Sequence, residues 1–330
     1  MQVHGALSLE FVAESYTQPT DVAAAGTVIT WIEKVGYAVA ASWSGTYVRT
    51  SYVGNMQFQN PVPVDTRALA QSRVVRTDGA NIHVQTRVLL PDVLDDDGDP
   101  IICTVCLLIY TAEEDGEDIP VRAWVPRTPG QIERDEQART ATEERATIEA
   151  KMSALPFPDE VRDHDELVRL RFVVGRPDTT IGAAVRASLI MRWIDEAASV
   201  CAARWSGREE VVAAFAGGVK FLGHIYVGEV VRVEALLVHT SARSMFVALR
   251  VFASPRHVRD GRLVAHSLAV MVAVDDGSAL PVPQWAPTTE GGRLLEESSV
   301  ELVALRSRAG ARWRPRDVAT SQTVSASFVD

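Results

Sequence analysis

The chain has 330 residues, of which 47% are hydrophobic, and a formal net charge of −10. This length favours two domains, and the negative charge argues against nucleic acid as a partner, because such a surface needs a dominant basic face. There is no apolar run of about 18 residues to span a membrane, residues 1–20 lack the features of a secretory signal, and three cysteines are too few for a disulfide framework. We therefore expect a cytoplasmic protein that does not bind membranes.

The first half of the chain is predicted to form a short strand, one helix and four longer strands. The strand begins at Leu7 ("LSLEFVAES"), and a helix of about five turns includes "ITWIEKVGYAVAASWSG" at 29–45. The β-branched runs "TYVRTSYVGNMQF", "TRALAQSRVVRT", "NIHVQTRVLLPD" and "PIICTVCLLIYTAEE" follow and favour strands. The turn signal "DDDGDP" at 95–100 predicts a hairpin between the last two.

A charged segment then joins the two halves. Residues 130–160, "GQIERDEQARTATEERATIEAKMSALPFPDE", are rich in Glu, Arg, Ala and Gln, which are strong helix formers. Pro156 and Pro158 would end the helix. We expect a solvated linker helix that packs loosely on the sheets.

The second half repeats the pattern of the first. A strand begins at Leu167 ("LVRLRFVVG"), a helix contains "MRWIDEAASVCAARWSG" at 191–207, and four β-branched runs follow. "RDGR" at 259–262 predicts the matching hairpin. The basic stretch 306–316, "RSRAGARWRPR", is interpreted as part of a solvated tail.

Residues at a nearly constant spacing show that the chain is a duplication. The tryptophans pair at an offset of 162 residues, as Trp31 with Trp193 and Trp43-Ser44-Gly45 with Trp205-Ser206-Gly207. Phe58 matches Phe221 and Thr77 matches Thr240 at an offset of 163, and "PVRAWVPRT" (120–128) matches "PVPQWAPTT" (281–289) at 161. These matches follow one order along the chain and therefore indicate two copies of one unit.

These observations predict an α+β fold with two similar domains in tandem. A helix that is apolar nearly all round has to be enclosed, so in each copy the antiparallel sheet is expected to wrap around it. The predicted boundaries are residues 1–129 for the first domain, 130–162 for the charged helical linker and 163–290 for the second domain. Residues 291–330 are predicted to form a C-terminal helix and flexible tail.

Three segments carry a resemblance to a known family: "WIDEAASVCAARWSG", "YVGEVVRVEALLVHTSARSMFVALRVFA" and "GSALPVPQWAPTTEGGRLLEE". With the duplication, they resemble the tandem double-hotdog acyl-CoA thioesterases, the cytosolic acyl-CoA hydrolase family, over both halves to about residue 300. The resemblance implies two hotdog domains paired side by side, acyl-CoA bound at the seam between them, and assembly into homotrimers. It implies no cofactor, because coenzyme A is part of the substrate.

The resemblance also implies which residues do the chemistry. Asp195 stands where the family has its working carboxylate, which would orient or deprotonate water. The backbone N–H of Gly26, at the start of the first helix, would hold the developing oxyanion with support from the helix dipole. Glu33 is the counterpart of Asp195 in the first half, where relatives often carry a glutamate that does not work.

Local pairing is the alternative reading of both carboxylates. Arg192 and Ser199 lie on the helix face of Asp195, so the aspartate could be satisfied without any substrate. Thr30 and Tyr37 offer the same to Glu33, for which local pairing is the favoured interpretation.

The loops that lead into the two helices depart from the family pattern of His-Gly-Gly, preceded in the first half by Asn. In the first half Val22 takes the Asn place, Ala24 the His place and Ala25 that of the first Gly, so only Gly26 remains. In the second half Arg186, Ala187 and Ser188 occupy the three places. The Cβ of Ala25 narrows the space in which the backbone could approach a ligand. Loss of the Asn amide, which would orient the water, can cost about 10²-fold in rate. A non-catalytic acyl-CoA-binding or assembly protein is therefore a second hypothesis.

The remaining motifs say less. Arg243 and Ser244 match the pair that relatives place near the CoA phosphates, although a surface arginine in a hairpin turn explains Arg243 equally well. Cys103 and Cys106 would point to opposite faces of a strand, so a shared metal site is not expected. We predict no metal site.

Overall fold

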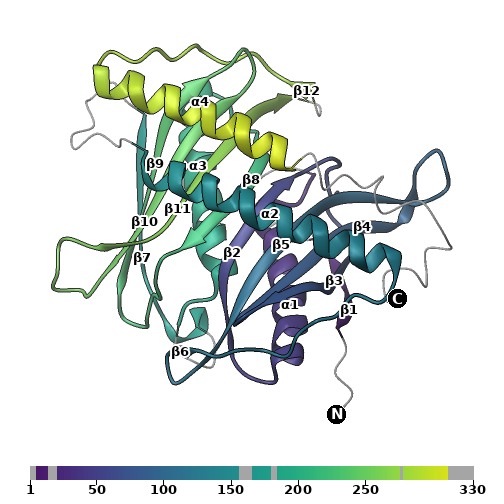
Figure 1. Cartoon of the computed structure of the whole chain (residues 1–330). Coiled ribbons are helices and arrows are strands. Elements are labelled where there is room, and N and C mark those ends of the chain that lie inside the picture. Colours follow the sequence, from purple (N-terminus) through teal and green to yellow (C-terminus); the bar gives the residue numbers. More distant parts are fainter. Residues whose placement is uncertain (1–4, 14–20, 156–165, 180–183, 276–277, 311–330) are drawn as a thin grey trace. The chain divides into compact units, whose positions relative to one another are not determined.

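The computed structural model describes residues 5–13, 21–155, 166–179, 184–275 and 278–310 (Figure 1). The chain divides into two compact units. Within the described ranges, the first unit contains residues 5–23, 27–147 and 308–310, and the second contains 24–26 and 148–307. None of the helices in these ranges has the combined length and apolar character needed to cross a membrane.

The first unit is an antiparallel sheet with one long helix on its inner face. The strands lie in the order β1-β3-β4-β5-β2, with a two-residue strand β6 pairing with β5. Their bounds are β1 (Ala6–Val12), β2 (Val48–Gln57), β3 (Arg67–Asp78), β4 (Asn81–Leu94), β5 (Pro100–Glu114) and β6 (Glu117–Asp118). The helix α1 (Ala25–Ser44) buries Val28, Ile32, Val35 and Val39, which recur at the spacing of one helix face.

The second unit repeats this topology strand for strand. Its order is β7-β9-β10-β11-β8, with β12 pairing with β11. The bounds are β7 (Leu167–Val173), β8 (Val211–Phe221), β9 (Val230–Thr240), β10 (Met245–Ser254), β11 (Arg262–Asp275) and β12 (Ser278–Ala279), with a 3-10 turn η1 (Arg176–Asp178) after β7. The helix α3 (Ala187–Ser206) packs on β7 to β11. The predicted α+β fold of two hotdog domains is confirmed.

The repeated tryptophans have the same structural role in both units. Trp31 of α1 stacks on Phe11 of β1 with ring centroids 5.3 Å apart, and Trp193 of α3 stacks on Phe172 of β7 at 4.9 Å. Farther along α1, the indole N–H of Trp43 donates to the Arg122 carbonyl at 3.2 Å. Aromatic stacking of this kind stabilises the fold by more than the buried area alone would. This explains why the two copies still have the same residues at these positions.

Both copies of the long helix end in the same way. Gly45 and Gly207 follow the helices with φ of 75° and 66°, and their N–H groups donate to the carbonyls of Ala41 and Ala203. Glycine adopts this left-handed conformation without a Cβ penalty and satisfies a carbonyl of the last turn. The Trp-Ser-Gly repeat therefore encodes the helix end. The indole N–H of Trp205 also donates to the Pro283 carbonyl at 2.8 Å, which ties this end to the segment after β12.

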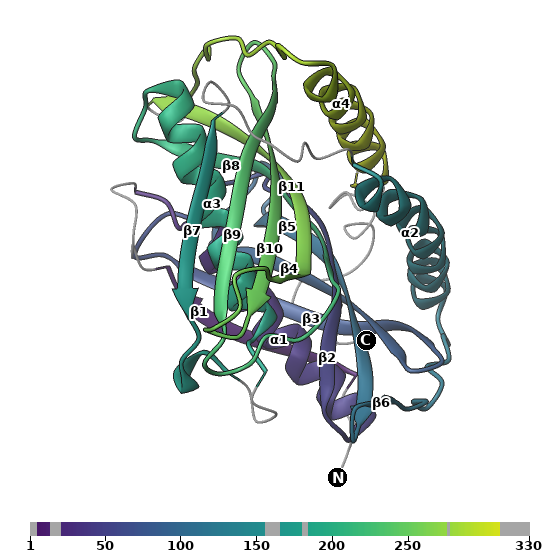
Figure 2. The ribbon, with the colours of Figure 1, turned by 90° about the vertical axis from the view of Figure 1, so that its left-hand side faces the viewer.

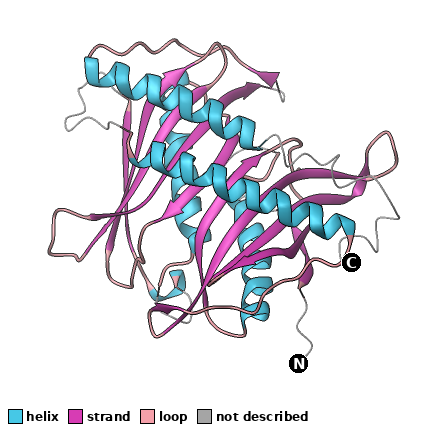
Figure 3. Cartoon of the chain, in the orientation of Figure 1, coloured by secondary structure: helices cyan, strands magenta, loops and turns pink. Residues whose placement is uncertain are grey.

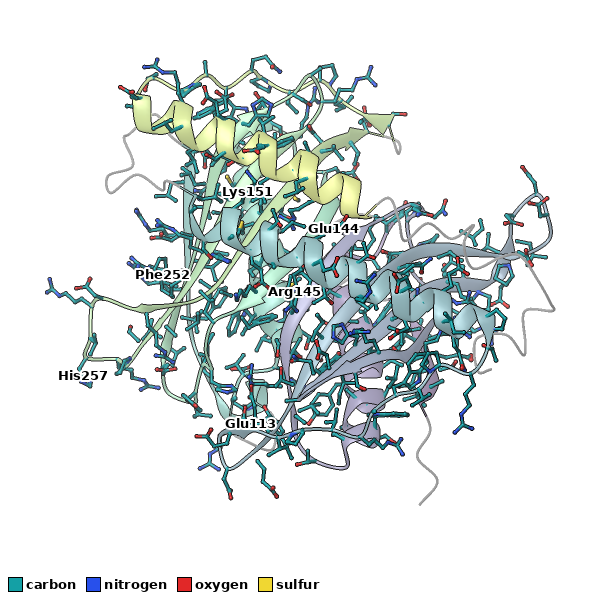
Figure 4. The ribbon with its side chains drawn as sticks, viewed as in Figure 1. Glu113, Glu144, Arg145, Lys151, Phe252 and His257 are labelled. Atoms are coloured by element: carbon teal, nitrogen blue, oxygen red, sulfur yellow. The ribbon has the colours of Figure 1, made fainter. Side chains whose placement is uncertain are left out.

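The outer face of each sheet is also covered by helix (Figures 2 and 3). In the first unit, α2 (Pro129–Ser153) packs Ala138 against Val75 and Leu107, and Asp135 pairs with Arg76 of β3 at 3.2 Å. Arg145, marked in Figure 4, lies with its guanidinium carbon 5.2 Å from the ring centroid of Tyr52. The helix expected in this segment is present, but these buried contacts differ from the loose, solvated packing that we predicted. The predicted domain boundaries themselves stay a prediction.

In the second unit the cover is α4 (Glu290–Gly310), with the end of α2. Glu296 of α4 lies 2.8 Å from Nδ1 of His239 on β9, and Leu302 is fully buried. Arg306 is also fully buried and donates to the Leu268 carbonyl of β11 at 2.8 Å. Our interpretation of 306–316 as a solvated stretch is therefore wrong for Arg306, because the helix continues past it and places it over the sheet. Residues 311–316 lie outside the described residues.

With both faces covered, the central strands have no solvent-facing side. In β4 every residue from Ile82 to Leu90 is buried, and in β5 every residue from Cys103 to Ala112 is buried. The antiparallel sheets therefore carry long buried runs in place of the alternation of one buried and one wet face.

Candidate active site

The carboxylate of Asp195 lies in the middle of α3, among residues that face the sheet. Ile194 and Ala198 next to it are buried, while Asp195 is partly buried. This helix begins at Ala187, after the N-cap residue Arg186 with its extended backbone, and continues for 20 residues. Asp195 is therefore a polar group held in an apolar environment by the helix that carries it.

Asp195 accepts a hydrogen bond from the start of α1. The backbone N–H of Gly26 donates to Asp195 Oδ2 at 3.0 Å, and residues 24–26 belong to the second unit together with α3. The first N–H groups of a helix have no partner within the helix, and the helix dipole favours an anion at that end. The structure thus joins the two residues that we predicted as base and oxyanion donor, but through a hydrogen bond to each other.

A side chain at residue 26 would disturb this contact. An added Cβ would lie 3.3 Å from Asp195 Oδ2 and 3.2 Å from Cγ of Arg192, so both neighbours would have to move by a few tenths of an ångström to accept it. Ala25 begins α1 and is partly buried. Gly26 is therefore the point at which the first turn of α1 meets the face of α3 that carries Asp195.

Burial raises the pKa of Asp195 to about 6, with the nearby charge of Glu196 acting in the same direction and the Gly26 hydrogen bond opposing both. A carboxyl group with this pKa is mostly ionised at neutral pH and still a better proton acceptor than an ordinary aspartate. The environment therefore suits a general base.

Arg192, which we considered as a local partner of Asp195, is paired elsewhere. Its Nε lies 3.6 Å from Glu196 Oε1, one turn along α3, and its side chain is about half exposed. Pairs of this kind at the surface contribute little. The structure thus gives Arg192 a partner that we did not predict.

Glu33, the counterpart in the first unit, has a structural environment. Its side chain is buried, and its Oε1 accepts a hydrogen bond of 3.4 Å from the Thr50 hydroxyl of β2. The hydroxyl of Tyr110 donates to the Glu33 backbone carbonyl at 3.2 Å. We favoured pairing of Glu33 with residues on its own helix. Thr50 lies on β2, so helix spacing could not identify it as a partner.

The other predicted residues lie in two separate places. Val22 forms an isolated bridge with Pro63 in the first unit. Arg243 and Ser244 lie in the turn between β9 and β10, where the Arg243 side chain is exposed and the hydroxyl of Ser244 is 2.6 Å from that of Ser241. Their predicted role near the CoA phosphates stays a prediction. Across the described ranges, no three His, Cys, Asp or Glu side chains are grouped so that they could hold a metal ion.

Comparison with known proteins gives a consistent picture. A family model described as the thioesterase superfamily matches the chain twice, at residues 22–93 and 187–259. A Bacillus subtilis protein named as an uncharacterised acyl-CoA thioester hydrolase is 33% identical over 113 residues, which are 34% of this chain and 65% of that protein. The human cytosolic acyl coenzyme A thioester hydrolase is 26% identical over 148 residues, 44% of this chain and 39% of the human protein.

The matches therefore span 65% and 39% of the lengths of these two relatives. Among solved structures, a Lactobacillus plantarum protein provisionally described as an oleoyl thioesterase superposes with a TM-score of 0.54 at 10% identity. That superposition covers 83% of this chain and 98% of the other. At this identity the likeness supports the fold alone.

Proposed function

We propose that this chain, which a thioesterase-superfamily model matches in two places, hydrolyses acyl-CoA thioesters to free acid and CoA, with Asp195 activating the water. The observation that carries the proposal is a carboxylate of raised pKa on the enclosed helix α3, bonded to the first turn of α1. Fold alone would not support an activity. The two named relatives are acyl-CoA thioester hydrolases, which indicates the substrate class.

In this mechanism the ionised Asp195 accepts a proton as the water oxygen attacks the thioester carbonyl carbon. The tetrahedral intermediate then collapses, the carbon–sulfur bond breaks, and the protonated Asp195 returns its proton to the leaving CoA thiolate. The Gly26 N–H binds Oδ2, and in this mechanism Oδ1 is the oxygen that accepts the proton. Placement of the site at the seam between the domains and a homotrimer stay predictions of the resemblance, and a cytoplasmic location stays a prediction from the sequence.

The Gly26 N–H has two competing acceptors in this mechanism, the Asp195 carboxylate and the oxyanion. It was assigned to the oxyanion, yet it donates to Asp195. For hydrolysis, the thioester oxygen has to displace Oδ2 from this N–H or be held by another N–H in the first turn of α1. A donor lost from an oxyanion hole costs about 10²-fold or more in rate.

This competition favours a second candidate, a protein that binds acyl-CoA without turnover. Val22, Ala24 and Ala25 at the entry to α1 replace the polar and glycine positions of the family pattern, and the Gly26 N–H is already bonded to Asp195, so fewer groups remain to stabilise the transition state. Such a protein would bind a non-hydrolysable acyl-CoA analogue in calorimetry and release no CoA from any substrate.

The experiment that separates these candidates measures CoA release from acyl-CoAs of several chain lengths. The wild type is compared with Asp195→Asn and with Glu33→Gln, which changes the counterpart carboxylate in the other unit. We expect Asp195→Asn to lose at least about 10²-fold in kcat and Glu33→Gln to retain the wild-type rate. Equal rates for wild type and Asp195→Asn would exclude Asp195 as the base.

A further inference from the structure

The second unit carries arginines on one face of its strands β7 and β9. Phe172 of β7 stacks on Trp193 of α3, so the alternate residues Arg169 and Arg171 point away from that helix. Arg171 lies directly opposite Arg232 of β9 in the ladder, and residues in that relation share a face of the sheet. Three arginines of two neighbouring strands therefore lie together on the face opposite α3.

The hairpin between β10 and β11 extends this basic surface. Its residue Arg256 donates from Nε to the carbonyl of Gly228, just before β9, at 3.1 Å. Phe252 of β10, labelled in Figure 4, is paired with Arg232 in the ladder, and its ring centroid lies 4.6 Å from the guanidinium carbon. The surface therefore combines positive charge with an aromatic ring. We call it the arginine face, and it consists of Arg169, Arg171, Arg232 and Arg256.

A single carboxylate counters the charge of these strands. Glu234 is the one acidic residue in β7, β9 and β10, all of whose residues the structure describes. It is buried and lies within ion-pair distance of three arginines, Arg169 at 3.1 Å, Arg232 at 3.4 Å and Arg250 at 2.9 Å. The side chains of Arg169 and Arg232 are 49% and 31% exposed. Arg171 and Arg256 are exposed as well. The arginine face is therefore positive and open to solvent.

The matching hairpin of the first unit has the opposite charge. The turn between β4 and β5 contains four aspartates, Asp95, Asp96, Asp97 and Asp99, here called the acidic hairpin. Asp95 Oδ1 accepts the backbone N–H groups of Asp97 and Asp99 at 3.0 and 2.9 Å, which holds the turn in one shape. Asp96 and Asp97 are exposed, and the adjoining Leu94 is 57% exposed. The acidic hairpin therefore presents carboxylates and an apolar side chain to solvent.

The strands of the first unit do not repeat the arginine face. β1 and β7 align through the phenylalanines that stack on the repeated tryptophans. In this alignment the places of Arg169, Arg171 and Arg232 are taken by residues without a positive charge, which are Ser8, Glu10 and Leu69. The two units have therefore diverged to opposite charges, which gives each molecule two complementary surfaces.

We propose that the acidic hairpin of one molecule docks on the arginine face of a second copy of this chain. Opposite surface charges attract and fix the orientation of an encounter, whereas the net charge of −10 makes other approaches of two copies repulsive. Leu94 beside the acidic hairpin and Val173 at the end of β7 are each 57% exposed, so the contact also has apolar area to bury.

Because two different surfaces meet, every molecule can give one hairpin and receive another. Such a heterologous contact closes into a ring when the rotation between neighbours allows it, and otherwise continues as an open chain. The proposal does not depend on thioester hydrolysis or on the assembly that the resemblance implies.

The test measures self-association by analytical ultracentrifugation at about 0.1 M and about 1 M salt, where the screening length falls from about 10 Å to about 3 Å. The hairpin variant is Asp96→Arg/Asp97→Arg, the face variant is Arg171→Glu/Arg256→Glu, and a combined variant carries all four changes. We expect the association constant of the wild type to fall at least about tenfold at the higher salt. The hairpin and face variants should show the same loss at the lower salt. The combined variant, which has the net charge of the wild type, should regain association because both charges are exchanged.

Mixing the hairpin variant with the face variant locates the contact. The face variant keeps an unchanged acidic hairpin, and the hairpin variant keeps an unchanged arginine face, so one contact can form between the two molecules. We expect the equimolar mixture to form a 1:1 dimer at the lower salt, although neither variant associates alone.

The control Glu114→Arg/Glu117→Arg changes the net charge as much as the hairpin variant does, at exposed positions outside the acidic hairpin. It should associate at least as strongly as the wild type, and circular dichroism checks that each variant is folded. The proposal is overturned if the wild type stays monomeric at the lower salt, which would leave the arginine face to another anionic partner. It is also overturned if association is equally strong at both salt concentrations, or if the control loses as much as the hairpin variant.

Discussion

Replacing Asp195 by asparagine is expected to stabilise the fold while it removes the proposed base. Asparagine has nearly the same shape, and its side-chain oxygen can still accept the Gly26 N–H, but it carries no charge to bury. The pKa of Asp195 rises from 3.8 to about 6 on folding. At about 1.4 kcal/mol per unit, the ionised carboxylate costs about 3 kcal/mol of stability at pH 8.

The pH dependence distinguishes this effect from an ordinary packing change. Between its unfolded and folded pKa values Asp195 binds more protons in the folded state, so stability falls as pH rises from about 4 to about 6 and then stays level. The cost at pH 5 is therefore only about 1.5 kcal/mol. Urea unfolding of both proteins at pH 5 and pH 8 measures the difference, with Glu196→Gln as the control for a neighbouring charge.

We expect Asp195→Asn to gain about twice as much at pH 8 as at pH 5. The reasoning is refuted if the asparagine variant is less stable than the wild type at pH 8, or if its gain is the same at both values. If the asparagine variant is more stable as expected and has also lost its activity, stability and function oppose each other at Asp195.

Three further outcomes are expected. The kcat/KM of thioester hydrolysis should fall tenfold per pH unit below about pH 6, since only ionised Asp195 accepts the proton; a flat pH–rate profile from 5 to 8 would contradict this. Gly26→Ala should lower kcat at least about tenfold with the fold retained by circular dichroism, because its Cβ would meet Asp195 Oδ2 and Arg192; an unchanged kcat would show that the contact is not needed. Gly207→Ala should cost about 1 kcal/mol in urea unfolding, since its φ is 66° and nothing else lies within 4 Å of the added Cβ; no loss would mean that the helix end rearranges freely.

Much of the fold could be predicted because its signals are local. The strands at 100–114 and 245–254 are bounded by turn residues on either side, and α1 and α3 each end at a Trp-Ser-Gly repeat. Because the chain is a duplication, each strand of one half could be checked against its counterpart in the other half. The two units have the same strand order.

The site was predictable only in part, because its contacts join distant positions. Asp195 and Gly26 could be named as separate groups, but not that one donates to the other, since they lie 169 residues apart. The same applies to Thr50 beside Glu33. The buried polar side chains of the β3–β4 hairpin had a visible signal that we did not use: Gln71 and Arg73, then Gln85 and Arg87, recur at alternate positions in runs that otherwise indicate buried strands.

The double cover of the central strands limits how this protein can change through evolution. In β4 and β5, adjacent side chains point to opposite sides, yet both sides are buried along Ile82–Leu90 and Cys103–Ala112. A systematic substitution scan across Ile82–Leu90 should therefore find no alternating pattern of tolerated sites, and drift in this region should proceed through paired changes in strand and helix.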